Sequence, residues 1–100
     1  MSDDWVADVE IVTLAPKPGA RDELLRIRPQ ILAEYDAFCG GRYDATLTEN
    51  EDGGWVDVWR WVDRADAEAA LDDIPGIIPT FARWAELVDL ESLVWVKRIG

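Results

Sequence analysis

The stretch WVDVWRWV at residues 55–62 decides the fold. Its tryptophans and valines favour an extended strand, in which alternate side chains point to opposite faces of a sheet. One face carries Trp55, Asp57, Trp59 and Trp61, and the other carries Val56, Val58, Arg60 and Val62. Both faces are mainly apolar, whereas an antiparallel strand with one face in water alternates between apolar and polar residues. We therefore expect this strand to be buried on both faces.

Hydrophobic periodicity and turn residues divide the rest of the chain into further segments. Strands are predicted at 5–15, 42–49 and 93–99. Helices are predicted at 21–38 and 63–74, with a second helical stretch at 77–89. Pro29 lies inside the first helix and predicts a kink or a break, because proline lacks the amide hydrogen that a helix needs.

The order strand-helix-strand-strand-helix-strand is the ferredoxin-like βαββαβ arrangement, an α+β fold with a four-stranded antiparallel sheet. Both helical segments cover one face of such a sheet, so the face that carries the valines of 55–62 stays uncovered within one chain. Residues 1–100 leave nothing with which to build a second layer there. We therefore expect one domain that pairs through its sheet with a second copy, since two-fold dimers are the commonest assemblies.

Composition narrows the functional classes. The chain has 100 residues, of which 49% are apolar and 31% charged, as in a single globular domain. Its net charge of −11 argues against nucleic acid as a partner, and no apolar run is long enough for a membrane span. The acidic first residues do not look like an export signal, and Cys39 is the single cysteine, so we expect a cytoplasmic location. Without histidine, no metal site is expected.

Three stretches of this sequence resemble a known family. They are Lys17-Pro18-Gly19 before the first helix, Gly41 at the start of the second strand, and VWRWVDRADA at residues 58–67. Together they look like the antibiotic biosynthesis monooxygenase domain of the dimeric α+β barrel superfamily. The most specific feature is a tryptophan that ends the third strand and a small polar or acidic helix cap two residues later, matched by Trp61 and Asp63. The resemblance implies a homodimer with a ligand cavity between the sheet and helices of each monomer.

The same resemblance implies several activities: cofactor-free oxygenation of polycyclic phenols, haem degradation and quinol oxidation. In the cofactor-free monooxygenases the tryptophan matched by Trp61 lies in the cavity, and an asparagine four residues earlier helps to bind the substrate. Asp57 stands at that position here, which is a departure from the family pattern. The haem-degrading members hold iron through a histidine on the second helix, which this chain lacks, so no cofactor is expected.

Asp57 is the first candidate for a catalytic role, together with Trp61. A carboxylate between tryptophans is costly to bury unless it is paired, so one interpretation is an ion pair with Arg42 or Arg83, or exposure at the cavity mouth. The other is a general base that takes a phenolic or α-carbonyl proton. Dioxygen can oxidise the resulting anion without metal or flavin, or the anion can rearrange, as in an isomerase or cyclase.

The remaining candidates would bind a substrate. Trp55 and Trp59 could form a slot for a planar ring or could simply fill the core. Tyr43, Arg83 and Trp84 are further candidates for contact with a ligand. The sequence thus predicts a cofactor-independent monooxygenase that acts on a small polycyclic aromatic or quinol-like substrate. The alternative is a non-catalytic dimer that binds a small hydrophobic ligand.

Overall fold

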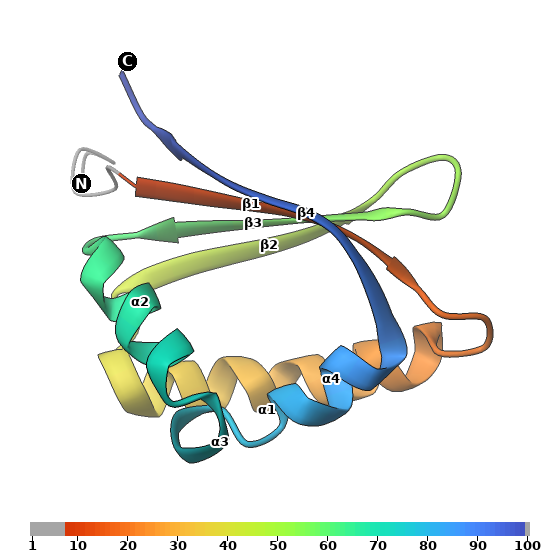
Figure 1. The fold of residues 1–100 in the computed structure, drawn as a ribbon, viewed down its shortest axis with the longest axis horizontal. Helices are drawn as coiled ribbons and strands as arrows, with labels where there is room; N and C mark the ends of the chain where they lie inside the picture. The colour runs from red at the N-terminus through yellow and green to blue at the C-terminus, as the bar shows by residue number, and fades with distance from the viewer. Residues whose placement is uncertain (1–7, 100) are drawn as a thin grey trace.

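The computed structural model describes residues 8–99, which form an antiparallel sheet covered on one face by helices (Figure 1). In chain order the elements are β1 (Asp8–Pro16), α1 (Arg21–Cys39), β2 (Tyr43–Glu49), β3 (Trp55–Trp61), α2 (Arg64–Asp72), α3 (Ile74–Ile77), α4 (Phe81–Leu87) and β4 (Val88–Lys97). This confirms the predicted α+β, ferredoxin-like order with a four-stranded sheet. The first three residues of the strand predicted at 5–15 lie outside the described residues.

The strands lie in the order β2-β3-β1-β4, so β1 and β3 are central and β2 and β4 form the edges. All neighbouring pairs are antiparallel. The register places Glu10 of β1 opposite Trp59 of β3, and Val12 opposite Asp57. Residues opposite each other in an antiparallel pair point to the same face, so these four side chains all project toward the helices.

Helix α1 continues through Pro29 without a break. Pro29 is exposed, whereas Leu24 and Ile31 are buried, so the proline lies on the solvent side of the helix. The carbonyl group that loses its hydrogen bond to proline can be hydrated there, which reduces the cost of the missing bond. The helix ends at Cys39 and is capped by Gly40, whose φ of 66° is left-handed and whose amide donates to the carbonyl of Asp36.

The second helical region contains three helices, where the sequence predicted two helical stretches. Asp63 caps α2, because its Oδ1 accepts a hydrogen bond of 2.9 Å from the amide of Ala65. Asp73 caps the short α3 in the same way, through the amide of Gly76. Pro79 stands between α3 and α4, where a proline favours a change of direction.

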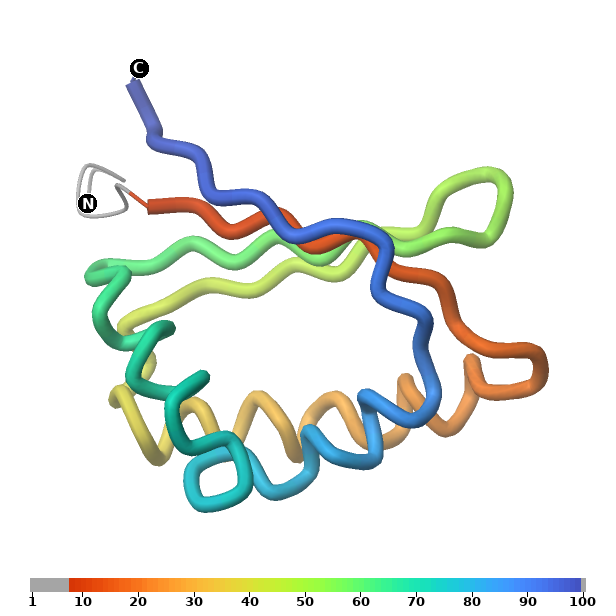
Figure 2. The backbone as a smooth tube through the Cα atoms, in the orientation of Figure 1, coloured from red at the N-terminus to blue at the C-terminus, as the bar shows by residue number. Residues whose placement is uncertain are grey.

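The last strand begins at Val88, five residues before the predicted start at 93, and α4 ends at Leu87. Its first part pairs with the end of β1 and is separated from the rest by a register shift opposite Thr13 and Leu14. Such an irregularity bends a strand, and β4 curves down from the sheet to meet α4 (Figure 2). The sequence analysis missed this segment because Val88 lies four residues after Trp84 and continues the apolar stripe of the predicted helix at 77–89.

The inward face of β3 is buried as predicted. Trp55, Asp57, Trp59 and Trp61 are only 1–7% exposed, and they pack toward the helices. On the opposite face of the sheet, Val94 and Val96 remain 48% and 44% exposed. No helix within residues 8–99 has the length and apolar character required to cross a membrane.

Candidate active site

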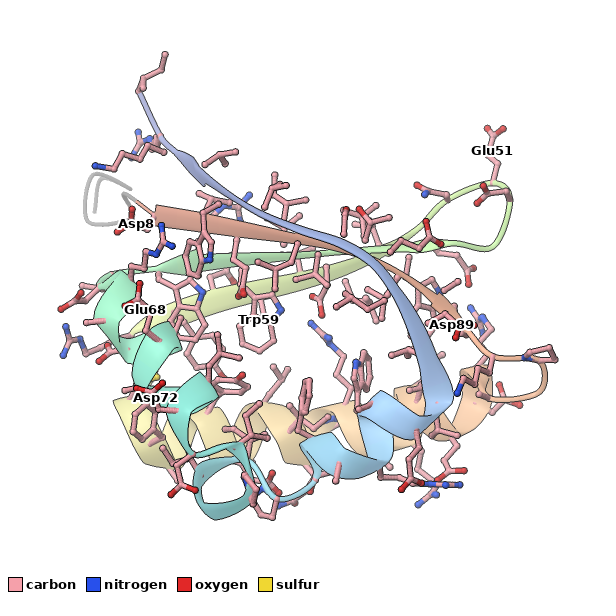
Figure 3. The ribbon with its side chains drawn as sticks, viewed as in Figure 1. Asp8, Glu51, Trp59, Glu68, Asp72 and Asp89 are labelled. Carbon is pink, nitrogen blue, oxygen red and sulfur yellow. The ribbon has the colours of Figure 1, made fainter. Side chains whose placement is uncertain are left out.

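A cavity of about 260 Å³ lies between the sheet and the helices. Strands β1, β3 and β4 form one side of it, and α1, α2 and α4 form the other. Figure 3 shows Trp59 extending from the sheet into this space. Most lining side chains are apolar, and the charged ones are Glu10, Arg28 and Asp57. Small-molecule sites have this character, with apolar walls and a few polar groups that orient the ligand.

Three exposed leucines mark the mouth of the cavity. Leu71 of α2 and Leu90 and Leu93 of β4 line it, yet they are 52%, 63% and 42% exposed. Exposed leucines that cluster around an opening mark a surface where an apolar ligand can bind or enter. The bend in β4 brings Leu90 to this position, which the straight strand predicted at 93–99 would not have done.

Asp57 forms a buried ion pair with Arg28 of α1. Its two oxygens each accept a hydrogen bond of 2.8 Å from the guanidinium group, and the two side chains are only 8% and 12% exposed. The guanidinium carbon lies 5.8 Å from the ring centres of both Trp59 and Trp84, within the range of a cation–π contact. This bidentate geometry is the strongest form of carboxylate–arginine pairing.

Arg28 therefore replaces Arg42 and Arg83, which the sequence suggested as partners of Asp57. Arg42 lies 3.8 Å from Asp66, and Arg83 pairs on the surface with Glu23 at 2.6 Å. The physical reason is the helix geometry of α1, which places Arg28 one turn after the buried Leu24 and therefore under the sheet.

Glu10 is a second acidic group in the cavity, to which the sequence analysis assigned no role. It is 9% exposed and lies between Trp59 and Trp95 on the inward face of the sheet. Burial raises the pKa of its carboxyl above the usual range, and the nearby charge of Asp57 raises it further. The indole N–H of Trp61 and the charge of Arg64 partly offset this rise in pKa.

The Trp61 indole lies close to Glu10 but does not bond to it in good geometry. Its Nε1 is buried and has no hydrogen-bond partner among the described residues, although it helps to lower the pKa of Glu10. Leaving a buried donor unpaired costs about 1–3 kcal/mol. A small movement of the Glu10 carboxylate toward Trp61 would satisfy this donor.

Tyr35 of α1 completes the polar part of the wall. Its ring centre lies 4.8 Å from that of Trp59. Burial, together with the charges of Glu10 and Asp57, raises the pKa of its hydroxyl to about 12. The hydroxyl therefore keeps its proton at neutral pH and can act as a hydrogen-bond donor.

Of the predicted site residues, Asp57, Trp59 and Trp84 line the cavity, whereas Trp55, Trp61, Tyr43 and Arg83 do not. Trp55 and Trp61 are each 1% exposed, and the Trp55 indole donates to Glu49 at 2.9 Å. Tyr43 stacks on Trp59 and donates its hydroxyl to the carbonyl of Leu32 at 2.9 Å. These three aromatic side chains pack in the solid core beside the cavity.

The fold is shared with solved structures of low sequence similarity. A monooxygenase from the gene ActVA-Orf6 of Streptomyces coelicolor, solved with Nanaomycin D, has a TM-score of 0.74 and 18% identity, covering 98% of this chain and 92% of its own. SnoaB of Streptomyces nogalater, a cofactor-independent oxygenase, has a TM-score of 0.69 and 20% identity, covering 94% and 95%. A nipsnap family protein of unknown function from Agrobacterium tumefaciens has a TM-score of 0.69 and 19% identity, covering 95% and 90%.

No family model matches the chain, and a search of the curated proteins found no match. The structural likeness confirms that the chain has the fold of antibiotic biosynthesis monooxygenase domains. Proteins with this fold include cofactor-independent oxygenases and proteins without an assigned role. A shared fold at this level of identity says nothing about substrate or catalysis, which depend on the side chains of the cavity.

Proposed function

We propose that this protein is a cofactor-independent monooxygenase that acts on a small polycyclic phenol or quinol-like substrate. The observation that supports the proposal is the cavity itself, which joins aromatic walls to a small charged group of Glu10, Arg28 and Asp57. Trp59 and Trp84 would contact the rings of the substrate from either side of Arg28, and Arg28 would orient its oxygen atoms. The volume of about 260 Å³ lies just below the usual range of small-molecule pockets, about 300–1,000 Å³, and so favours a compact ligand.

The chemistry needs only a base and dioxygen. In an anthrone, removal of one proton from the methylene carbon leaves an electron-rich anion, and that carbon then forms a bond to dioxygen. Protonation gives a hydroperoxide, and loss of water gives the quinone. One oxygen atom enters the product and the other leaves as water, while the electrons come from the two C–H bonds of the substrate.

Oxygen uptake tests this function. The protein is mixed with anthrone, 1,8-dihydroxyanthrone and a set of hydroquinones, and the product is analysed for one atom of labelled oxygen after reaction with ¹⁸O₂. We expect Ala85→Trp to abolish most of the acceleration, because Ala85 is an exposed residue that lines the cavity and a large side chain there would obstruct it. Ala82→Trp places the same group at an exposed position of α4 that does not line the cavity and should leave the rate unchanged. Equal rates with and without protein across the whole set would refute the function.

We further propose that two copies pair through the bare face of the sheet. The register aligns Ile11 with Val58 and Val94 on this face, and Val9 with Val96. These residues form an apolar strip across three strands, and an exposed apolar strip of this kind favours association. A second copy is the partner that provides a matching strip by symmetry.

Sedimentation tests the pairing. The wild-type protein should sediment at twice the mass of the 11.3 kDa chain, and Val58→Lys should return it to that mass. Leu25→Lys, at a 41% exposed position on α1, is the matched control and should remain paired. A wild-type protein that sediments at 11.3 kDa at micromolar concentration would rule out the dimer.

A cytoplasmic location also belongs to this proposal. It is supported by Cys39, the single cysteine of the chain, which is buried as a thiol and donates to the carbonyl of Tyr35 at 3.2 Å. A reducing compartment keeps such a thiol intact. Imaging of the tagged protein in its natural host would test the location.

A further inference from the structure

We infer that Glu10, and not Asp57, accepts the proton of the substrate. The inference rests on the proposed function, because it concerns the first step of that reaction. It assigns the base to a residue of β1 that the sequence patterns did not single out. Asp57 then serves to hold Arg28 in the cavity.

Asp57 is poorly placed to act as a base. Both of its oxygens already accept 2.8 Å hydrogen bonds from Arg28. Protonating it would break a bidentate pair in a buried site and leave the arginine without its counter-charge, which is strongly unfavourable. The pair does leave other N–H bonds of the guanidinium group for a ligand, because only two of its five are used by Asp57.

Glu10 meets the requirements that Asp57 does not. It lines the same cavity, is 9% exposed, and forms no ion pair among the described residues. The unpaired indole N–H of Trp61 lies beside it and can donate to the carboxylate. The site thus contains a carboxylate that can receive a proton and a buried donor that can hold that carboxylate in position.

The charged groups around Glu10 also indicate the class of substrate. Asp57 of β3 faces it with a negative charge, and Arg64 of α2 faces it with a positive one. Arg28 and Tyr35 of α1 complete the polar surroundings, while the cavity residues of α4 and β4 carry no titratable group. Of the residues that line the cavity, ionised Glu10, Asp57 and Arg28 carry charges that sum to −1, which repels an anion, and Arg64 does not line it. The substrate therefore enters as a neutral weak acid and loses its proton inside the cavity.

The step can be written for anthrone. A C–H bond at the methylene carbon (C10) breaks, its electron pair moves into the ring system and onto the carbonyl oxygen, and the proton passes to an oxygen of Glu10. The guanidinium of Arg28 and the Tyr35 hydroxyl are the donors available to the developing oxyanion. No oxidant is needed for this step, so it can be measured without oxygen.

The experiment is hydrogen–deuterium exchange at C10 of anthrone in D₂O, under argon, followed by proton NMR. Wild-type protein should accelerate the exchange, and Glu10→Gln should lower the acceleration by about 100-fold or more, the range for loss of a general base. Glu51→Gln, in the exposed hairpin labelled in Figure 3, is the matched control and should exchange as the wild type does. Glu10→Asp keeps a carboxyl and should retain part of the acceleration, which guards against a simple loss of folding.

Trp61→Phe tests whether the indole N–H of Trp61 positions the Glu10 carboxylate or whether its loss only disturbs the structure. The Trp61 N–H lowers the pKa of Glu10, so its removal should raise that pKa and move the acid limb of the exchange rate to higher pH. A merely structural defect would lower the rate at every pH by the same factor.

Each outcome decides one point. Exchange that is lost in Glu10→Gln, without oxygen uptake by the wild type, would refute the oxygenase function and keep Glu10 as the base. Oxygen uptake with undiminished exchange in Glu10→Gln would overturn the role of Glu10 and keep the oxygenase. Exchange that survives in Glu10→Gln and disappears in Asp57→Asn would make Asp57 the acceptor. Absence of any acceleration by the wild type would also overturn the inference.

Discussion

Glu10 and Asp57 are diagonal neighbours on adjacent strands of one sheet, yet their surroundings differ. Asp57 is neutralised by Arg28 at 2.8 Å, whereas Glu10 faces an indole donor and a more distant arginine. Both are almost completely buried. The difference shows that burial alone does not make a carboxyl reactive, because a carboxylate locked in an ion pair has no free oxygen to offer.

The largest expected effect is a loss of stability when the ion pair between Asp57 and Arg28 is broken. Arg28→Met should lower the free energy of unfolding by about 3–5 kcal/mol, because it leaves Asp57 buried without a counter-charge. Urea denaturation measures the loss. The double variant Arg28→Met with Asp57→Leu should recover most of it, since the remaining groups are apolar. Arg26→Met, at a 73% exposed side chain of the same helix, should change stability by less than about 0.5 kcal/mol. A similar small change for Arg28→Met would show that the pair does not hold Asp57.

A substitution at Tyr43, in the packed core beside the cavity, should cost less stability than Arg28→Met does. It should leave ligand binding unchanged. Tyr43→Phe removes one hydrogen bond to Leu32 and should cost about 0.5–1.5 kcal/mol of stability. The affinity of the Tyr43→Phe variant for 1,8-dihydroxyanthrone, measured by calorimetry, should equal that of the wild type, because Tyr43 does not line the cavity. An affinity that falls several-fold would return Tyr43 to the binding site, where the sequence analysis had placed it.

The smallest expected effect is a gain of stability when the buried carboxyl of Glu10 is replaced. Burial raises the pKa of Glu10 in the folded state, so the folded protein binds the proton more tightly than the unfolded chain does. Stability from this group is therefore highest at low pH and falls as pH rises through the ordinary value and then the raised one. Glu10→Gln should melt at a higher temperature than wild type at pH 8, and the difference should shrink toward pH 4. A lower melting temperature at pH 8 would mean that the ionised carboxylate is well paired in the fold.

The sequence was a good guide wherever a pattern repeats. The two-residue period of β3 correctly placed Asp57, Trp59 and the buried tryptophans under the helices. The start of β4 was wrong by five residues, because Val88 lies four residues after Trp84 and continues the apolar stripe of the predicted helix at 77–89, whereas pairing with β1 makes it part of a strand. Local propensity cannot reveal such long-range pairing.

The charged residues of the site were harder to predict. Arg28 and Asp57 are 29 residues apart in sequence, and although the tryptophans around Asp57 marked it as a candidate, Arg28 alone looks like an ordinary surface charge. Both nevertheless lie on the buried face of their own element. Arg28 shares its face of α1 with Leu24 and Ile31, and Asp57 shares its face of β3 with the buried tryptophans. Glu10 shares the phase of Leu14 on β1 in the same way. A charged residue on the apolar face of a helix or strand was therefore the signal available in the sequence, although it does not identify the residue with which that charge pairs.

The sandwich of Arg28 between Trp59 and Trp84 also gives the molecule an optical property. These two indoles border the cavity, whereas Trp55 and Trp61 are sealed in the core at 1% exposure. Indole emission responds to the electric field and to ring contacts at its surface, so an arriving aromatic molecule changes the light from Trp59 and Trp84. The chain therefore carries its own fluorescent reporter of cavity occupancy, without any attached label.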